Sequence, residues 1–471
     1  MSALLSRRLL FSAPALLLPR KSSAAAPLNV LFVAADDMNN ALGCYGHPVV
    51  KSPNIDRLAA RGTRFDRAYC QYPLCGPSRT SLLSGMRPDT TTIWENEIAV
   101  RDTLPNAVTL PQLFRNHGYH SQRLGKMYHM GVPTTVGTNL YDDPPSWDVA
   151  ISPKGAEDKT EGEGRNITPK VGAGGAFHWI SFRGAGKDQA DDSAAEQAVE
   201  MIAAKRDKPW FLGLGFLRPH VPHVAPARFF DLYPLQTLKP VVNPEGDLAD
   251  IPKASEITIN TRANDMGMND ADKREALRGY YASVSYMDWN VGRVLDAVEK
   301  ANAADRTVVV FWGDHGWHLG EHHRWQKRSL FEESSRVPLV VSAPGRKGRG
   351  TGSRALVELV DLYPTIAELC GLKPPANLEG QSFVPLLDNP SRAWKKAAFT
   401  QVSNKKEIVG RAVRTDRYRY IRWEGAYPDD ELYDHRSDPH EYTNLARDPS
   451  RAGDVKAMRA VLDAGWRAAR A

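Results

Sequence analysis

The sequence predicts an α/β protein with a mainly parallel central sheet flanked by helices, followed by a smaller α+β domain. Short apolar runs rich in β-branched residues alternate with amphipathic helical segments, which is typical of parallel sheets covered on both faces. Several of these runs end in charged or imidazole side chains, at the edge where open α/β sheets bind ligands. After residue 385 the pattern changes to strand-like alternation, which predicts a separate unit.

The elements of the larger part are predicted from their apolar patterns. Unbroken apolar runs indicate four buried strands, at residues 28–34, 210–216, 307–312 and 337–341. Glycine-terminated segments or apolar stripes of helical period indicate four helices, at residues 53–62, 110–118, 192–205 and 274–300. The segment 133–190 is polar and rich in Gly, Pro, Asp and Ser, so we expect long loops there and no further domain.

The C-terminal part is predicted to be a small α+β unit. Residues 407–413 and 417–423 alternate like two antiparallel strands, and a final Ala/Arg-rich helix is expected at about 452–470. The predicted organisation is a signal segment, a main domain and a C-terminal subdomain, with bounds at 1–26, 27–385 and 386–471.

The composition excludes several classes of protein. The 471 residues are 42% hydrophobic, which excludes a disordered chain and a small disulfide scaffold. The formal charge of +6 owes much to residues 1–26, which contain four basic residues and no acid. With this segment set aside, the charge gives no support for nucleic-acid binding.

The N-terminal segment is predicted to be an export signal. Arg7 and Arg8 precede the apolar stretch 9–18, and small residues follow at 22–26. The paired arginines resemble a twin-arginine signal, so we expect an exported protein, periplasmic or secreted. A disordered tail or a single membrane anchor is the alternative. Beyond this segment no apolar run approaches the ~20 residues of a membrane helix, so no span is expected after signal removal.

The four cysteines, Cys44, Cys70, Cys75 and Cys370, are too few for a disulfide framework. In an exported protein they allow two disulfides, whereas a small buried apolar side chain is the commoner role for Cys44 and Cys370. Cys70 and Cys75 have a C-x4-C spacing, which is a poor zinc signature without a second pair.

Two pairs of polar residues follow two of the predicted strands. Asp36 and Asp37 come directly after the first strand, and Asp314 and His315 follow the third. Adjacent carboxylates repel unless a positive charge lies between them, and Ca²⁺ and Mg²⁺ prefer oxygen ligands. Imidazole suits transition metals better. The four residues together predict a divalent cation site, and solvated turns or helix caps are the alternative.

The segment around Cys75 carries a second chemical signal. A cysteine at the start of a helix, with Arg79 nearby, has the environment of a thiolate nucleophile. A tyrosine-phosphatase loop requires arginine at the sixth position after the cysteine, and that position is Ser81. The sequence that surrounds a papain-like cysteine is also absent.

The motif C-G-P-S-R followed by T-S-L-L-S-G, at residues 75–85, resembles the signature of the sulfatase family. The resemblance extends over most of residues 28–385, and residues 431–445 look like sulfatase C-terminal sequence. It implies an alkaline-phosphatase-like fold with a catalytic domain at 27–385 that hydrolyses sulfate esters. It also implies that a formylglycine-generating or sulfatase-maturating enzyme converts Cys75 to formylglycine.

Within the family, the iduronate-2-sulfatase branch has the most similar stretches. They include L-G-C-Y-G at 42–46, G-K-M-Y-H at 125–129, R-P-H-V-P at 218–222 and the run 314–327. Many other sulfatases have asparagine where this chain has His315. The resemblance implies a sulfated saccharide substrate, with the sulfate at position 2 of a uronic acid or a similar acidic sugar, in polysaccharide degradation.

The resemblance also implies the cation ligands. Calcium, with magnesium as the alternative, is expected to bind Asp36, Asp37, Asp314 and His315, and residue 75 as formylglycine is expected to touch the ion. A hydrated aldehyde offers two hydroxyl groups on one carbon. One attacks sulfur and the other later expels sulfate, whereas a plain serine or cysteine would stay esterified.

Further catalytic roles follow from the same resemblance. Arg79 is expected to hold the formylglycine, and Lys126 and Lys327 to clamp the sulfate. His129 is the expected base that later breaks the covalent intermediate. His220 is the expected general acid, together with Lys327. A cation and two lysines suit this ester because its negative charge must be cancelled before a nucleophile approaches. A surface lysine and a structural histidine are the alternatives for Lys327 and His129.

Recognition of the sugar involves other residues. Arg218, beside the expected acid, is a candidate partner for a sugar carboxylate, because a guanidinium binds a carboxylate bidentately; a surface arginine is the alternative. His223 occupies a position where the resemblance leads us to expect an aromatic ring, and we expect it beside the sugar. Three further histidines are expected at the rim or in structural roles, with zinc binding as the alternative: His318, His322 and His323.

Two other classes of function remain open. The first is another enzyme of the same superfamily, namely a choline sulfatase, a phosphonate monoester hydrolase or a phosphodiesterase. The second is a non-catalytic polysaccharide-binding protein. The second is disfavoured because the chain keeps the whole catalytic set: Cys75, Arg79, Lys126, His129, His220 and Lys327.

Overall fold

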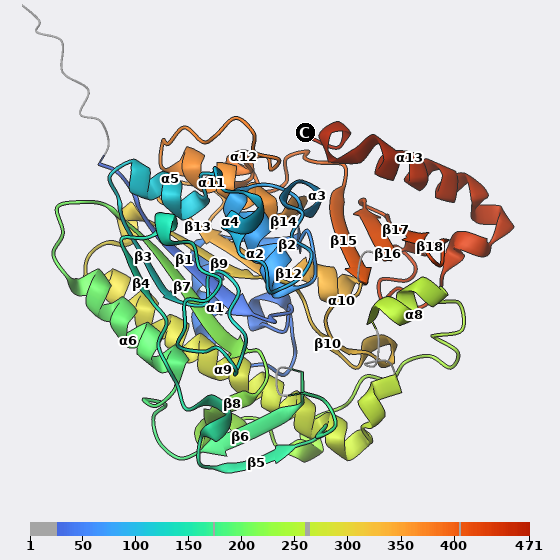
Figure 1. Ribbon diagram of the computed structural model, residues 1–471, viewed down its shortest axis with the longest axis horizontal. Helices are drawn as coiled ribbons and strands as arrows, with labels where there is room; N and C mark the ends of the chain where they lie inside the picture. The colour runs from blue at the N-terminus through green and yellow to red at the C-terminus, as the bar shows by residue number, and fades with distance from the viewer. Residues whose placement is uncertain (1–25, 173–174, 260–263, 405–406) are drawn as a thin grey trace, which may run out of the picture.

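The computed structural model describes residues 26–172, 175–259, 264–404 and 407–471, so the predicted signal segment lies outside the described residues except for its last residue. Within these residues, nine strands form a central sheet in the order β12-β2-β13-β9-β1-β7-β3-β4, with β14 paired to β2 (Figure 1). Their bounds are β1 (Asn29–Asp36), β2 (Thr63–Tyr69), β3 (His120–Gly125), β4 (Val149–Ile151), β7 (Trp210–Pro219), β9 (Thr307–Gly313), β12 (Arg336–Val337), β13 (Leu339–Ser342) and β14 (Thr351–Glu358).

The centre of this sheet is parallel, as predicted. β1 pairs in parallel with both β7 and β9, and β3 pairs in parallel with β7 and β4. β13 runs antiparallel to β9 and to β2, so the sheet as a whole is mixed. The four strands expected from apolar runs are confirmed as β1, β7, β9 and the pair β12 and β13.

Alternate residues of the central strands face two separate cores. On β1, Leu31 and Val33 face one core, whereas Val30 and Phe32 face the other. The first core is closed by α1 (Pro53–Arg61), α6 (Ala190–Ala203) and α9 (Asp270–Lys300). The second is closed by α2 (Cys75–Ser84), α5 (Leu110–Asn116), α11 (Leu362–Leu369) and α12 (Val384–Asp388) (Figure 1). Because helices cover both faces, the strands are apolar on both sides and read as unbroken runs.

The prediction of long loops at 133–190 holds for most of this segment but missed three short strands among its described residues. Besides β4, this segment contains β5 (Glu163–Asn166) and β6 (His178–Phe182), which form a three-stranded sheet with β8 (His223–Pro226). β5 is exposed along its whole length, so it lacks the apolar alternation by which a half-buried strand is detected. Short elements complete the main part: α3 (Pro88–Thr91), α4 (Val100–Thr103), α7 (Ala227–Phe230), α8 (Lys253–Ile259), α10 (Glu332–Ser335), β10 (His318–Leu319) and β11 (Trp325–Gln326).

The smaller C-terminal α+β unit is confirmed. Its antiparallel sheet consists of β15 (Ala398–Asn404), β16 (Ile408–Arg414), β17 (Tyr418–Gly425) and β18 (Asp429–Asp434), and α13 (Ala452–Ala468) packs on one face. The opposite face packs against Leu74 and Phe331 of the main part. Between the two parts, buried Arg419 pairs with Glu332 and Glu441. The unit is thus joined to segments that flank Cys75 and Lys327.

All four cysteines carry free thiols, so the expectation that they allow two disulfides is wrong. Cys70 and Cys75 are buried, whereas Cys44 and Cys370 are partly exposed. Among the described residues, no helix combines the length and the apolar character that a membrane span requires.

Two facing glycines allow β3 to approach β7 closely just before Lys126. Gly125 lies opposite Gly215 in the strand register, and the N–H of Lys126 donates to the carbonyl of Gly215 at 2.8 Å. A Cβ on Gly215 would collide with the backbone of Lys126, and a Cβ on Gly125 would collide with the carbonyl of Gly215. Gly125 also has φ +73°, a conformation that side chains disfavour. The position of the Lys126 backbone therefore depends on both glycines.

We predict that Gly215→Ala lowers the free energy of unfolding by about 1–3 kcal/mol, because the added methyl group forces the backbone of Lys126 to move. Thermal and denaturant unfolding measure the change. Gly453→Ala is the matched control, since nothing lies within 4 Å of its added Cβ. An unchanged melting temperature in Gly215→Ala would show that the close approach is not required.

Candidate active site

The carboxyl ends of β1 and β9 bring three of the predicted acids together. The two strands lie side by side in parallel with Ala35 opposite Gly313, so Asp36, Asp37 and Asp314 leave the sheet at one edge. All three residues are fully buried. The N–H of Asp37 donates to Oδ1 of Asp314 at 3.1 Å, which ties the two strand ends together.

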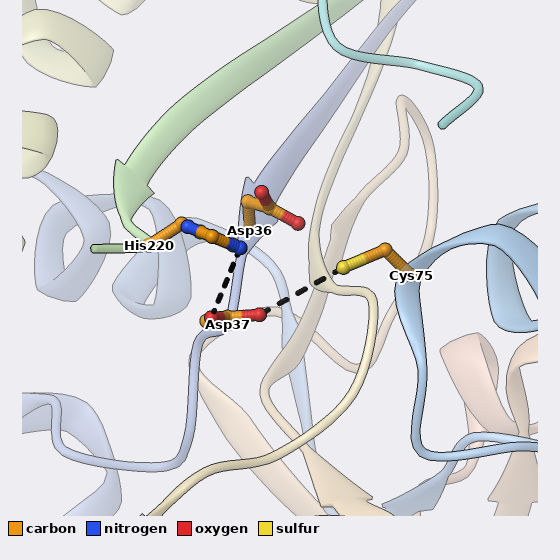
Figure 2. A group of neighbouring side chains, drawn as sticks. All are labelled: Asp36, Asp37, Cys75 and His220. Carbon is orange, nitrogen blue, oxygen red and sulfur yellow. Dashed lines mark hydrogen bonds and ion pairs between the residues drawn. The ribbon is translucent and has the colours of Figure 1, made fainter. Parts of the chain in front are cut away.

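Cys75 reaches these acids as the first residue of α2. The N–H of Gly76 donates to Oδ1 of Asn96 at 2.9 Å, which satisfies one of the donors that a helix start leaves free. The sulfur of Cys75 lies 3.9 Å from Oδ1 of Asp37 (Figure 2). His220 lies on the other side of Asp37, with its Nε2 3.6 Å from Oδ2 of the carboxylate (Figure 2). Asp37 therefore stands between the cysteine and this histidine.

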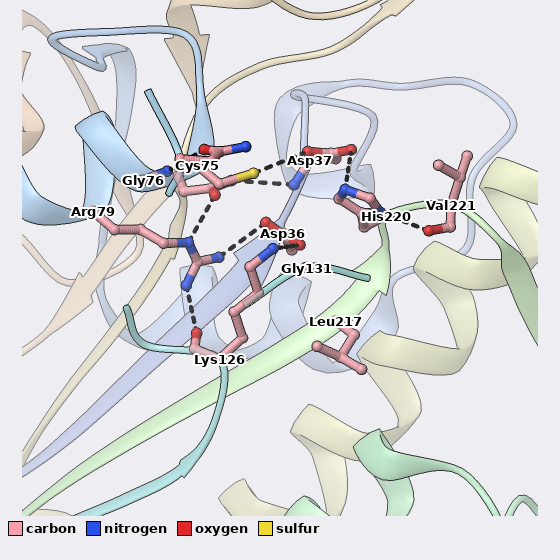
Figure 3. Close-up of polar contacts among 12 residues, drawn as sticks. Asp36, Asp37, Cys75, Gly76, Arg79, Lys126, Gly131, Leu217, His220 and Val221 are labelled. Carbon is pink, nitrogen blue, oxygen red and sulfur yellow. Dashed lines mark hydrogen bonds and ion pairs between the residues drawn. The ribbon is translucent and has the colours of Figure 1, made fainter. Parts of the chain in front are cut away.

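Arg79 and Lys126 offset the charge of two acids. Arg79 lies one turn along α2 from Cys75, and its Nε lies 2.8 Å from Oδ2 of Asp314. Its Nη2 lies 3.2 Å from Oδ1 of Asp36. Nζ of Lys126, the residue that follows β3, lies 2.6 Å from the other oxygen of Asp36 (Figure 3). All of these side chains are fully buried, so the ion pairs are shielded from solvent.

Lys327 enters the site from a strained segment. The residues on either side of it, Gln326 and Arg328, have φ +79° and +71°, in the left-handed region that non-glycine residues rarely adopt. Nζ of Lys327 lies 2.5 Å from Oδ1 of Asp37 and 3.1 Å from the sulfur of Cys75. Of the predicted cations, Lys327 is thus the one in contact with residue 75.

The pKa values in the site follow from burial and from the opposed charges. Burial would raise the pKa of Asp36, but Lys126 and further nearby cations hold it well below its usual range. Burial raises the pKa of Asp37 to about 7, although Lys327 opposes the shift. Burial and Asp36 would also raise the pKa of the Cys75 thiol, yet the two lysines lower it. The site therefore favours negative charge at residue 75.

His220 and His315 each have a defined tautomer. Nδ1 of His220 lies 2.6 Å from the carbonyl oxygen of Val221, and Nδ1 of His315 lies 2.9 Å from that of Gly316. Because a carbonyl oxygen only accepts, each Nδ1 carries a hydrogen. The two Nε2 atoms therefore face the acids, and that of His315 lies 3.4 Å from the sulfur of Cys75.

His129 lies at the edge of the site, three residues after Lys126. Its ring centre is 5.7 Å from that of Tyr141, and its Nδ1 has no hydrogen-bond partner among the described residues. Burial, with a contribution from Lys126, lowers the pKa of His129 to about 3. The ring is therefore neutral and has a lone pair available to accept a proton.

Arg218 does not lie where a sugar carboxylate would approach. The residue is 1% exposed, and its Nη2 pairs with Glu157. Its Nε donates to the carbonyl of Val224 at 3.2 Å, while its backbone N–H donates to Asp191 at 3.0 Å. The predicted contact with a substrate carboxylate is not supported, because the guanidinium and its carboxylate partner Glu157 are both buried. Arg218 instead holds the turn that carries His220.

His223 is also enclosed within the fold. It is 1% exposed, and its ring centre lies 5.9 Å from that of Phe177 and 5.8 Å from that of Tyr280. Neither ring nitrogen has a hydrogen-bond partner among the described residues. Burial lowers the pKa of His223 to about 3. Its predicted contact with the sugar is not supported by this position.

The sequence interpretation missed residues that hold the catalytic side chains in place. Glu157 and Asp191 fix Arg218, and Asn96 fixes the start of α2. Isolated acids and amides in a polar segment carry no pattern that separates them from solvated residues. Arg328 did have a signal, because it directly follows Lys327; its Nη2 pairs with Glu95.

The donor atoms fit a divalent cation. Two overlapping groups have ligand atoms within 4.8 Å of one another: those of Asp36, Cys75, Asp314 and His315, and those of Asp36, Asp37, Cys75 and His220. Oδ2 of Asp37 is buried without a hydrogen-bond partner among the described residues. His315 presents Nε2 while its Nδ1 is held by a carbonyl, as is usual for metal-binding histidines. The oxygen-rich set suits Ca²⁺ or Mg²⁺.

Comparison with known families agrees with this geometry. The family model described as Sulfatase matches residues 28–372. The chain belongs to the sulfatase family. A second model, described as N-sulphoglucosamine sulphohydrolase, C-terminal, matches residues 320–465 of this sulfatase. The family generally uses a formylglycine and a divalent metal ion. This sulfatase is therefore a hydrolase of sulfuric esters.

Relatives of this sulfatase are similar over most of their length. A sulfatase of Formosa agariphila is 33% identical over 92% of this chain and 86% of its own. Human iduronate 2-sulfatase is 31% identical, over 91% and 92%. A choline-sulfatase of Rhizobium meliloti is 28% identical, over 92% and 85%.

Solved structures show the same fold. The phosphonate monoester hydrolase of Agrobacterium radiobacter superposes with a TM-score of 0.79 at 22% identity, over 94% of this chain and 95% of its own. A protein solved with its substrate D-glucosamine-2-N,6-O-disulfate superposes with a TM-score of 0.75 at 21% identity, over 93% and 97%.

The zinc alternative for the histidine-rich segment finds no support. Nε2 of His318 lies 2.7 Å from Oγ of Ser329, and Nδ1 of His322 lies 3.1 Å from Oδ1 of Asp247. Within the described ranges, His318, His322 and His323 belong to no group of three metal-donor atoms within 4.8 Å.

We predict that Asp37→Asn weakens divalent-cation binding by more than about 100-fold. Changes of residues that only support the metal ligands typically cost about 10–100-fold. The reason is that Asp37 contributes a buried oxygen with no hydrogen-bond partner among the described residues. Elemental analysis after dialysis against a range of free Ca²⁺ measures the effect. The exposed Asp305→Asn is the matched control. Equal cation occupancy in both variants would remove Asp37 from the ligand set.

Proposed function

We propose that this sulfatase hydrolyses sulfate esters of carbohydrates in the manner of an iduronate 2-sulfatase, with a formylglycine at residue 75 and a calcium or magnesium ion. The observation that carries the proposal is the position of the Cys75 sulfur. It lies 3.1 Å from Nζ of Lys327 and 3.4 Å from Nε2 of His315, among buried acids that fit a cation. A group placed there meets an anionic ester already surrounded by positive charge.

Each nearby residue has a role that its geometry supports. When bound, the cation and the aldehyde hydrate supply a Lewis acid and a hydroxyl nucleophile. Lys126 and Lys327 neutralise the sulfate oxygens, and Arg79 holds the acids and residue 75 in register. The Nδ1 hydrogen of His220 is held by Val221, and burial keeps the pKa of this ring well below its usual range, so its Nε2 carries a lone pair. The proton for the leaving sugar oxygen therefore comes from the ammonium of Lys327, and His220 faces that oxygen as an acceptor.

His129 serves the second half of the reaction. Its neutral ring accepts the proton whose removal lets sulfate leave. The ring lies on the same loop as Lys126, directly after the end of β3.

Recognition of an acidic sugar falls to Arg328, which takes the role predicted for Arg218. Arg328 follows Lys327 directly, and its side chain is 32% exposed. Its Nη2 pairs with Glu95, while its Nε has no hydrogen-bond partner among the described residues. Glu95 precedes Asn96, which contacts the residue after Cys75. A substrate carboxylate at this edge can pair with Arg328 bidentately.

The second candidate is hydrolysis of choline sulfate or of a phosphonate monoester. A choline-sulfatase is among the relatives, and a phosphonate monoester hydrolase shares the fold. Glu95 and the exposed Glu97, at the same edge as Arg328, would suit a cationic choline group.

We also propose export to the periplasm or beyond the cell, and maturation by a formylglycine-generating or sulfatase-maturating enzyme. The proposal rests on the basic and apolar pattern of residues 1–26 and on the motif at 75–79.

We predict that the matured protein cleaves 2-O-sulfated uronate saccharides with a higher kcat/KM than choline sulfate or a phenyl phosphonate ester. Cys75→Ala removes turnover of all of them, because no hydroxyl nucleophile remains, while Cys370→Ala, outside the site, keeps it. Liberated sulfate and phosphonate are measured by ion chromatography. Turnover of choline sulfate or the phosphonate alone would establish the second candidate instead.

We predict that Arg328→Ala raises KM for a sulfated uronate by about 10–100-fold, because one charge-assisted pair is lost. KM for a neutral aryl sulfate stays within about twofold. Arg115→Ala breaks an exposed ion pair with Asp148 and serves as the matched control. Equal KM increases on both substrates would refute a carboxylate contact by Arg328.

A further inference from the structure

A cavity of about 330 Å³ lies between the main part of the chain and the C-terminal unit. Its walls come from Arg87 and the start of α3, from strands β15, β16 and β17, and from the end of α13. Figure 1 shows that end of α13 returning toward α3. α2 runs from Cys75 to Ser84, so its two ends are about 14 Å apart at 1.5 Å per residue. Arg87 and α3 follow the end that is far from Cys75. We name this cavity the C-terminal chamber.

Three arginines converge on one ring in the C-terminal chamber. Gly465, with φ +72°, interrupts α13, and the indole of Trp466 follows it into the chamber wall. The guanidinium carbons of Arg87, Arg467 and Arg470 lie 5.1, 4.2 and 4.7 Å from the ring centre. The ring face attracts each cation, but the three like charges repel one another.

The positive charge around Trp466 is only partly offset. Arg87 is 6% exposed and pairs with Glu358 at 2.7 Å, but its Nε is buried without a hydrogen-bond partner among the described residues. Arg467 is largely exposed and comes no closer than 4.0 Å to Glu379. Arg470 has no ion pair with the described residues, and its Nη2 donates to two backbone carbonyls at 3.4 and 3.5 Å.

The uncharged polar groups of the wall already have partners. The hydroxyl of Thr90 donates to Glu379 at 2.7 Å, and that of Thr400 donates to the carbonyl of Cys70 at 2.7 Å. The amide of Gln401 donates to Asp89 at 3.1 Å. Among the arginines, Arg87, Arg411 and Arg422 already pair with carboxylates. The guanidiniums left to meet an anion are therefore those of Arg467 and Arg470.

We infer that the C-terminal chamber is an accessory binding site for a sulfate or carboxylate group carried on a saccharide. The volume lies at the lower end of the range for ligand pockets, and guanidinium groups bind such oxyanions through paired N–H donors. The site lies at the other end of α2 from residue 75. A saccharide group bound there is therefore a different one from the sulfate ester that is hydrolysed at residue 75. The assignment of the ligand as a saccharide rests on the proposed function.

The test uses the full chain carrying Cys75→Ala, so that no substrate is consumed. Calorimetry measures the binding of three ligands: a heparin-derived hexasaccharide, its desulfated counterpart and inorganic sulfate. Each ligand is titrated into this protein and into the same protein carrying Arg467→Ala and Arg470→Ala. We expect the double change to weaken hexasaccharide binding about tenfold and the desulfated sugar to bind poorly to both. Arg206→Ala with Arg349→Ala, at exposed positions elsewhere, removes the same charge and is the matched control.

Each outcome has a defined meaning. Equal hexasaccharide affinity with and without the two arginines overturns the inference, and so does an equal loss in the control. Inorganic sulfate binding as tightly as the hexasaccharide overturns the saccharide assignment and leaves a site for the free anion. Turnover of a small monosulfated sugar by the active protein is measured separately. It is expected to be unchanged by Arg467→Ala and Arg470→Ala, so failure of the proposed function and failure of this inference are distinguishable.

Discussion

Burying a carboxylate without a partner costs several kcal/mol, and this chain buries Asp36, Asp37 and Asp314 side by side where β1 and β9 end. Three cations compensate: Arg79, Lys126 and Lys327 each lie within 3.2 Å of one of these acids. The two sets come from five segments that are far apart in the sequence. Their mutual neutralisation therefore fixes the start of α2, the end of β3 and the turn at residues 326–328 against the sheet.

The same arrangement accounts for the chemistry at residue 75. Removing one charged side chain from the set would leave its partner buried and unpaired. The acids and the basic side chains therefore depend on one another. A divalent ion held by these carboxylates would supply the positive charge that Lys126 and Lys327 now provide, which would leave both lysines available to sulfate oxygens. The sulfur of Cys75 lies 3.1 Å from Nζ of Lys327, beside both the buried acids and the lysine. In the proposed reaction, the side chains that balance charge in the protein are therefore the ones that recognise sulfate.

The sequence was sufficient to predict the parallel centre of the sheet, because β1, β7 and β9 are buried on both faces and read as apolar runs. The grouping of Cys75, Arg79, Lys126, His220 and Lys327 around the buried acids was predictable only from the family resemblance of the stretches at 75–85, 125–129, 218–222 and 314–327. Arg218 and His223 were predicted beside the sugar, whereas both are buried, because adjacency to His220 in sequence does not reveal that Glu157 neutralises the guanidinium. β5 escaped detection because it is exposed throughout. Contacts between distant polar residues leave no periodic pattern.

The central claim is that residue 75 supplies the nucleophile as a modified cysteine at the meeting point of the buried charges. The most direct measurement is the mass of the peptide that contains residue 75, taken from protein of known specific activity. The account predicts a CHO group in place of CH₂SH at residue 75, in a fraction that rises in proportion to activity. Full activity in protein whose residue 75 is entirely unmodified cysteine would contradict it.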